Sequence, residues 1–135
     1  MMVSTKGRYA LRVMIDLAEN GADGNYIAMK NVAERQDISL KYLEKILPDL
    51  VANGLVEGVH GKGGGYRLTR TPEEYNVCEI LKVTENGVAP VACLEEGAPE
   101  CERCSECRTI PMWTELNKVV DDYLSSVSLA SLMKK

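Results

Sequence analysis

Residues 38–66 read ISLKYLEKILPDLVANGLVEGVHGKGGGY, and this stretch decides the fold. Apolar residues recur at helical spacing over 40–53, where an Asn-Gly pair, a typical helix stop, closes the pattern. Two short apolar runs, 55–59 and 66–69, then enclose the glycine-rich segment 60–65. This order predicts a helix followed by a β-hairpin whose loop is flexible and positively charged.

The helix over 40–53 begins after Ser39, a residue type that caps helix N-termini. Pro48 removes one backbone donor and is expected to kink this helix, because the apolar period continues beyond it. The alternative is a helix that ends near Leu47. The predicted buried side consists of Leu40, Leu43, Leu47, Leu50 and Val51.

Upstream, two further helices complete a helix-turn-helix pattern. The first begins after Ser4 or Thr5, either of which can cap it, and buries a face of small and apolar residues. A short helix is expected over 29–35, and a turn over 36–38 joins it to the helix at 40–53. Together with the hairpin, these elements predict a mainly α fold with a small β-hairpin wing, a winged helix-turn-helix. The first buried face is Ala10, Val13, Met14, Leu17 and Ala18.

Downstream, a helix is expected over 77–85, followed by an irregular segment over 87–107 that is rich in Gly, Pro, Glu and Cys. A long helix runs from Pro111 to about Ser125, and a last short helix over 129–133 follows Ser128. We therefore expect a DNA-binding domain over 1–75 and a second unit over 76–135. The apolar stripe of the long helix is Trp113, Leu116, Val119, Val120, Tyr123 and Leu124.

The net charge of −4 is distributed unevenly along the chain. Residues 1–72 hold ten Lys and Arg against eight Asp and Glu, a charge of +2, whereas the remainder holds six against twelve, a charge of −6. The acidity therefore lies outside the predicted DNA-binding segment, although charge alone would not indicate a nucleic-acid binder.

Several function classes are not expected. The chain has no apolar run of about 18 residues and no secretory signal, which indicates a cytoplasmic protein that does not span a membrane. An enzyme is not expected, because the single histidine, His60, lies in the hairpin loop and no nucleophile–base pair is visible. The glycine-rich loop also lacks the Lys-Ser/Thr pair of a phosphate-binding loop.

The second helix of a winged helix-turn-helix enters the major groove, and its wing reaches the backbone or the minor groove. Lysines pair with phosphates or guanine edges, and hydroxyls donate to phosphate and base acceptors. Each feature alone also fits an ordinary solvated surface; their order along the chain favours DNA. The expected contacts are Ser39, Lys41, Tyr42, Glu44, Lys45, His60 and Lys62.

Glu44 is an acid on the predicted recognition helix, and two interpretations fit it. One is a surface ion pair with Lys41 at three-residue spacing. The other is discrimination between DNA sites, because a carboxylate in the major groove is tolerated only where a cytosine amino group donates to it.

Four of the five cysteines follow the spacing Cys93-x7-Cys101-x2-Cys104-x2-Cys107. Clustered cysteines in a chain without a secretory signal indicate metal ligands or redox thiols rather than structural disulfides. Thiolates suit iron–sulfur clusters and zinc equally, so this spacing leaves both open, as well as a thiol switch. Cys78, on the helix over 77–85, is expected to be a small buried residue.

The sequence resembles the IscR-type regulators of iron–sulfur cluster biogenesis over nearly its whole length. Relatives of these regulators include the nitric-oxide sensor NsrR and the cysteine-metabolism repressor CymR, which has the same fold without the cluster. The motifs that carry the resemblance are TKGRYA at 5–10, ISLKYLE at 38–44, GLV at 54–56 and GGGY at 63–66.

The resemblance implies a homodimer whose long C-terminal helices cross, a [2Fe–2S] cluster beside that interface, and palindrome-like DNA sites. Glu44 matches a family glutamate with a part in telling two classes of site apart. Two positions depart from the family: His60 stands where Arg is common, and Lys41 replaces a smaller residue. Both are expected to change how DNA is read.

The family uses three cysteines and a histidine as cluster ligands. Cys93, Cys101 and Cys107 match the cysteines, with two extra residues after Cys93, whereas Ile110 occupies the histidine position and cannot ligate. Cys104 is the nearest candidate for the fourth ligand. A carboxylate or a side chain from a partner subunit is another, and a [4Fe–4S] cluster or structural zinc are the alternatives to [2Fe–2S]. The candidate carboxylates are Glu100, Glu102 and Glu106.

Overall fold

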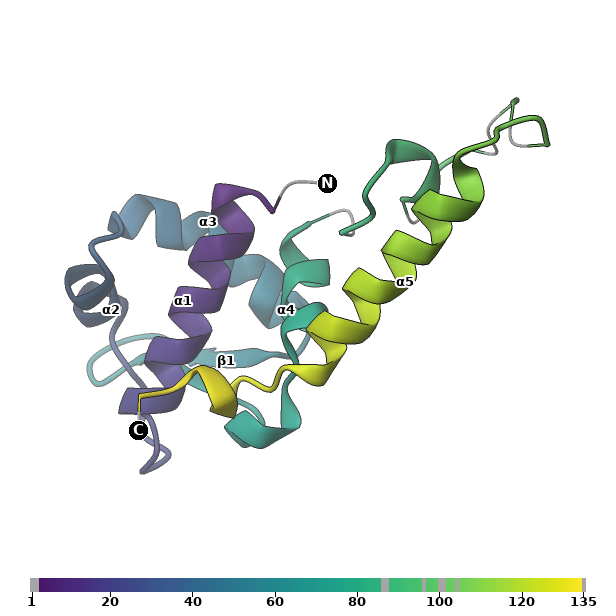
Figure 1. The fold of residues 1–135 in the computed structure, drawn as a ribbon. Helices are drawn as coiled ribbons and strands as arrows, with labels where there is room; N and C mark the ends of the chain where they lie inside the picture. The colour runs from purple at the N-terminus through teal and green to yellow at the C-terminus, as the bar shows by residue number, and fades with distance from the viewer. Residues whose placement is uncertain (1–2, 86–87, 96, 100–101, 104, 135) are drawn as a thin grey trace.

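The computed structural model describes residues 3–85, 88–95, 97–99, 102–103 and 105–134, and it confirms the mainly helical winged-helix architecture (Figure 1). No helix within these ranges is long and apolar enough to cross a membrane. The elements are α1 (Thr5–Asn20), α2 (Met29–Gln36), α3 (Leu40–Ala52), β1 (Val56–Val59), β2 (Gly65–Leu68), η1 (Pro72–Glu74), α4 (Val77–Thr84), η2 (Ala92–Leu94), α5 (Ile110–Ser126) and η3 (Ala130–Leu132).

Helix α1 lies at the centre of the fold and contacts α2, α4 and β2. Ser4 caps it as predicted, because the Ser4 side chain accepts a hydrogen bond from the Gly7 backbone at 3.1 Å. The predicted face is fully buried and joins residues of α2, α3, α4 and β1 in the main core cluster. The burial of this one face therefore draws the helix-turn-helix, the wing and α4 together.

The turn between α2 and α3 has the expected caps. Asp37 adopts the left-handed conformation with φ 52°, and Ser39 accepts a hydrogen bond from the Tyr42 backbone at 3.1 Å to start α3. Helix α3 continues through Pro48 to Ala52, so the alternative ending near Leu47 is wrong. Gly54, at φ +71°, supplies the predicted left-handed stop.

The buried side of α3 differs from the prediction. Leu43, Leu47 and Leu50 are buried as expected and Ile46 joins them, whereas Leu40 and Val51 are 46% and 43% exposed. At about 100° per residue, Leu40 and Val51 lie roughly 70–90° from the centre of the buried face. They therefore border that face and leave an apolar edge along the surface of α3.

The wing is a two-stranded antiparallel sheet in which Val56 pairs with Leu68 and Val59 with Gly65. Strand β1 is one residue shorter than the expected 55–59, and β2 is shifted by one residue from the expected 66–69. Ile27 forms an additional bridge to Tyr66, with backbone N–O distances of 2.8 and 2.9 Å in the two directions. This bridge ties the wing to the segment before α2, a pairing that the sequence pattern did not indicate.

Tyr75 anchors the base of the wing, where the two strands leave the core. Its side chain is buried, its hydroxyl donates to the Leu55 carbonyl at 2.7 Å, and it accepts from the backbones of Thr69 and Arg70, both at 3.0 Å. The Arg70 guanidinium lies 4.4 Å from the centre of its ring. The wing therefore leaves the core from a fixed base.

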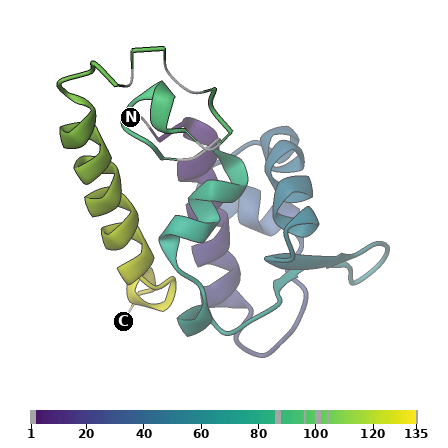
Figure 2. The ribbon, with the colours of Figure 1, turned by 90° about the vertical axis from the view of Figure 1, so that its right-hand side faces the viewer.

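Helix α5 packs against α4 and otherwise stands away from the body of the molecule (Figures 1 and 2). The predicted apolar stripe divides. Val120 and Leu124 pack against a second core cluster around Val77 and Leu81, whereas the other side of the stripe faces outward. The final helix is a three-residue turn, η3, within the predicted 129–133. The outward-facing residues of α5 are Met112, Leu116, Val119 and Tyr123.

A buried ion pair joins α1 to α2. Asp16 is 1% exposed, and its carboxylate accepts from Arg35 Nη2 at 2.7 Å, Arg35 Nε at 3.0 Å and Gln36 Nε2 at 2.9 Å. The hydrogen bond from Arg35 to Asp16 raises the pKa of the guanidinium. This network fixes the last turn of α2 directly before the turn into α3.

The two residues of this ion pair should contribute unequally to the free energy of unfolding. Arg35→Ala leaves a buried carboxylate with only Gln36 to donate to it, so we expect a loss of about 3 kcal/mol in unfolding free energy. Asp16→Asn leaves a half-exposed guanidinium that water can solvate, and about 1.5 kcal/mol should be lost. Urea denaturation measures both. Lys118→Ala, which breaks a solvent-exposed pair with Asp122 on α5, is the control and should leave the midpoint unchanged. Equal losses for the two variants would contradict this account.

Candidate nucleic-acid interface and cysteine loop

The outward face of α3 presents charged side chains without ionic partners. Lys41, Glu44 and Lys45 are all exposed. Within the described ranges, none of the ion pairs joins Glu44 to Lys41, which removes the support for a surface pair between them. These charges are therefore available to an external ligand.

Tyr42 is half-buried, and its ring is held by α1. The rings of Tyr42 and Tyr9 meet edge to face with centroids 5.3 Å apart. Arg12 lies over the Tyr9 ring at 5.1 Å, and the Lys45 ammonium lies 6.0 Å from the Tyr42 ring. The aromatic pair orients Tyr42 before any ligand arrives.

Two polar contacts complete the attachment of the helix-turn-helix to α1. Lys6 pairs with Asp49 of α3 at 2.5 Å, and Arg12 donates to the backbone carbonyl of Gln36 at the end of α2. The sequence analysis missed Lys6, Tyr9 and Arg12 as positioning residues. Their three-residue spacing along α1 is the signal that could have identified them.

The hairpin loop carries the two predicted wing residues. His60 and Lys62 are exposed. Gly61, between them, has a φ of +95°, and Gly63, which follows Lys62, has a φ of +79°. Gly64 has no room for a side chain, because a Cβ there would lie 2.2 Å from the Val59 carbonyl. The glycines therefore set the shape of the loop, and α3 and the hairpin lie at one edge of the molecule, opposite α5 (Figure 2).

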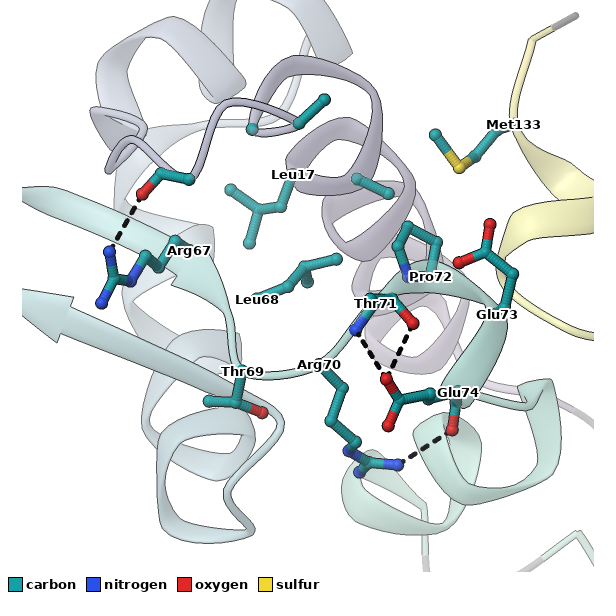
Figure 3. A pocket seen from close by; sticks show the side chains of 14 residues that line it. Leu17, Arg67, Leu68, Thr69, Arg70, Thr71, Pro72, Glu73, Glu74 and Met133 are labelled. Atoms are coloured by element: carbon teal, nitrogen blue, oxygen red, sulfur yellow. Dashed lines mark hydrogen bonds between the residues drawn. The ribbon is translucent and has the colours of Figure 1, made fainter.

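Two hollows border these elements. One, of about 350 Å³, lies between the wing and the ends of α2 and α3, where Val51, Val59 and His60 contribute to its wall. Another, of about 600 Å³, lies between the end of α1, β2 and η1 (Figure 3). None of the predicted DNA or metal residues lines the second hollow. Several of its polar side chains already have hydrogen-bond partners, as Thr71 has in Glu74 and Arg70 in the Glu74 carbonyl.

Two of the four predicted metal ligands fall within the described ranges. Cys93 lies in η2 and is exposed, and Cys107 is half-buried before α5. A hydrogen bond between Cys107 Sγ and Thr109 Oγ1, at 3.4 Å, lowers the pKa of the thiol and favours thiolate, the form that binds metals. Cys101, Cys104 and Glu100 lie outside the described residues.

The described residues contain no group of three or more His, Cys, Asp or Glu side chains close enough to hold a metal. Cys93 and Cys107 are free thiols, exposed and half-buried respectively, so their chemistry fits a thiolate-ligated group. Cys78 is buried as predicted, and its thiol donates to Asp121 Oδ1 at 3.7 Å.

Glu85 connects the start of the cysteine segment to α1, a contact that the sequence analysis missed. It directly follows α4, and its Oε1 accepts from the Ser4 backbone at 2.8 Å and from the Ser4 hydroxyl at 2.6 Å. A Cβ at Gly7 would lie 2.3 Å from the same oxygen. The residue that caps α1 is thus bound to the residue that ends α4.

Comparisons with known proteins agree with this architecture. The profile of the Rrf2 family, described as an iron-dependent transcriptional regulator, matches residues 3–135. The regulator IscR of Xenorhabdus nematophila is 36% identical over 134 residues, covering 99% of this chain and 80% of that protein.

Solved structures show the same fold. CymR, the global cysteine regulator of B. subtilis, superimposes with a TM-score of 0.77 at 30% identity, over 98% of this chain and 95% of its own. IscR of T. potens gives a TM-score of 0.72 at 32% identity, over 98% of this chain and 85% of its own. With a family match across almost every residue and a shared winged helix, the chain belongs to the Rrf2 family of transcriptional regulators.

Proposed function

We propose that this protein is a DNA-binding regulator that senses iron–sulfur cluster status through a [2Fe–2S] cluster and controls genes of cluster biogenesis. The observation that carries the proposal is the presence, in one Rrf2 chain, of an unpaired charged α3 face and a four-cysteine segment. The similarity to IscR proteins over 98–99% of the chain supports it. The protein acts in the cytoplasm and is not an enzyme.

The proposed DNA contacts follow the winged-helix docking mode. Helix α3 enters the major groove with Lys41, Tyr42, Glu44 and Lys45, and the wing brings His60 and Lys62 to the backbone or the minor groove. Ser39 Oγ already accepts from the Tyr42 backbone, which leaves its hydroxyl hydrogen for a phosphate. None of the ion pairs among the described residues involves Glu44, which fits a part in favouring sites with a cytosine amino group.

The cluster would be held by Cys93, Cys101 and Cys107, with Cys104 in place of the missing histidine. When bound, the cluster supplies a redox-active, oxidant-sensitive cross-link of the cysteine segment. The chain's own part is to end α4 at Glu85 and begin α5 at Ile110, so that both ends of the segment start from helices. Binding or loss of the cluster in this segment would then alter how α3 contacts DNA.

A homodimer is supported by the outward face of α5. Met112, Leu116, Val119 and Tyr123 follow spacings of four, three and four residues, the pattern of a helix–helix seam. A large exposed apolar stripe of this kind marks an interaction surface. Crossing of two such helices would present two α3 helices to a palindrome-like site.

A second candidate is a repressor that responds to cysteine status or nitric oxide through the same segment, and the similarity to CymR favours cysteine status. A regulator whose cysteines hold structural zinc is the third. All three share the DNA-binding face. Metal content separates an iron–sulfur cluster from structural zinc and from cysteines without metal.

Removing the Tyr42 hydroxyl tests base reading. Tyr42→Phe keeps the ring on Tyr9, so the thermal midpoint should hold while affinity for a specific duplex falls by about 1–3 kcal/mol and random-duplex affinity changes little. Lys62→Ala is the matched control and should weaken both duplexes alike while lowering the salt slope by about 1. Fluorescence anisotropy across a salt series measures both variants. If Tyr42→Phe lost equal affinity for the specific and the random duplex, the Tyr42 hydroxyl would contact the phosphate backbone and not a base.

Anaerobic reconstitution with iron and sulfide should give a coloured protein with about one two-iron cluster per chain. Cys93→Ala, Cys101→Ala and Cys107→Ala should each lose the visible absorption, and Cys104→Ala should weaken retention if Cys104 is the fourth ligand. Cys78→Ala, whose thiol is buried against Asp121, is the control and should retain the cluster. A colourless protein with one zinc per chain would refute the cluster.

Charging the α5 face should separate the subunits. Val119→Glu places a carboxylate in the proposed seam, and sedimentation should show a monomer with unchanged helix content, because Val119 makes no core contact. Lys118→Glu introduces the same side chain on another side of α5 and should remain dimeric. Dimeric Val119→Glu protein would contradict this interface.

A further inference from the structure

The exposed large apolar side chains before residue 86 all lie on α3 and the wing. Within the described ranges up to residue 85 they are Leu40 and Val51 on α3 and Val59 on the wing. The remainder lie on α5 and at Leu132. The proposed DNA-binding face thus combines unpaired charges with apolar groups that the core does not use.

Leu40 is the first residue of α3, the end of the recognition helix that reaches base edges in helix-turn-helix proteins. Ile38, two residues earlier, is buried in the core cluster, whereas Leu40 is 46% exposed and lies outside that cluster. Side chains of a helix tilt toward its N-terminus, so Leu40 extends past the start of α3. Glu44 lies one turn further along the same side.

An apolar side chain in the major groove has one base-specific partner, the 5-methyl group of thymine. We propose that Leu40 is a specificity-determining residue that contacts a thymine methyl in each half-site. This inference rests on the proposed DNA-binding function and adds to it a second kind of readout. Hydrogen-bonding groups such as Tyr42 and Glu44 would select donors and acceptors, while Leu40 would distinguish thymine from cytosine by shape and hydration.

The experiment replaces single thymines with deoxyuridine, which removes only the methyl group. A specific duplex is first selected by the wild-type protein from a random-sequence library. Each thymine is then replaced in turn, and affinity is measured for wild type and Leu40→Ala. Burial of one methyl corresponds to an affinity loss of about fourfold. We expect wild type to show this loss at one thymine per half-site, and Leu40→Ala to show no loss there.

The control is Lys45→Ala, on another side of the same helix. It should weaken binding to every duplex but keep the fourfold penalty at the same thymine, because it leaves the methyl contact intact. Leu40→Ala should retain the wild-type thermal midpoint, since Leu40 is not part of the core.

Two results would overturn the inference while leaving the proposed function in place: no thymine that is sensitive to deoxyuridine in wild type, or the same sensitivity in Leu40→Ala. Failure of the wild-type protein to select any sequence would instead refute specific DNA binding itself, and this inference with it.

Discussion

The buried ion pair between Asp16 and Arg35 is the constraint on which the DNA-binding face depends. A carboxylate at 1% exposure is unfavourable without partners, and the last turn of α2 supplies Arg35 and Gln36 as partners. Satisfying Asp16 therefore sets the position of Gln36, whose carbonyl is held in turn by Arg12. The left-handed turn at Asp37 and the Ser39 cap follow within three residues, so the direction of α3 is determined largely by this network.

Sequence patterns identified the helices, the wing and the caps because these depend on local signals: Ser4, Ser39, the glycine stop at Gly54 and helical periodicity. Burial was predicted less well at the borders of each stripe. Leu40 and Val51 have the spacing of core residues, yet the number of neighbouring elements decides how wide a face is covered. The same holds for α5, whose stripe is only partly covered by α4, while its other side is exposed among the residues that the structure describes.

Long-range polar contacts were beyond the sequence analysis. Asp16 is one acid among many in the sequence, and nothing local marks it as buried. Tyr75 is likewise an unremarked residue between two helices, although its hydroxyl bonds three backbone groups at the base of the wing. Of the candidate DNA contacts on α3 and the wing, Tyr42 is half-buried and the others are exposed, and their role in DNA binding stays a prediction. The grouping of the cysteines stays a prediction, because Cys101 and Cys104 lie outside the described residues.

The bond between Glu85 and Ser4 has a thermodynamic consequence. One carboxylate oxygen joins the entry to the cysteine segment with the cap of α1, and α1 in turn holds α3 through Lys6 and Tyr9. If a ligand of the cysteine segment shifts Glu85 when it binds, α1 must shift too or lose this bond. The free energy of that change reduces the net binding free energy of the ligand. Linkage makes such an effect reciprocal: DNA that favours one position of α1 changes the affinity of the segment for its ligand by the same factor.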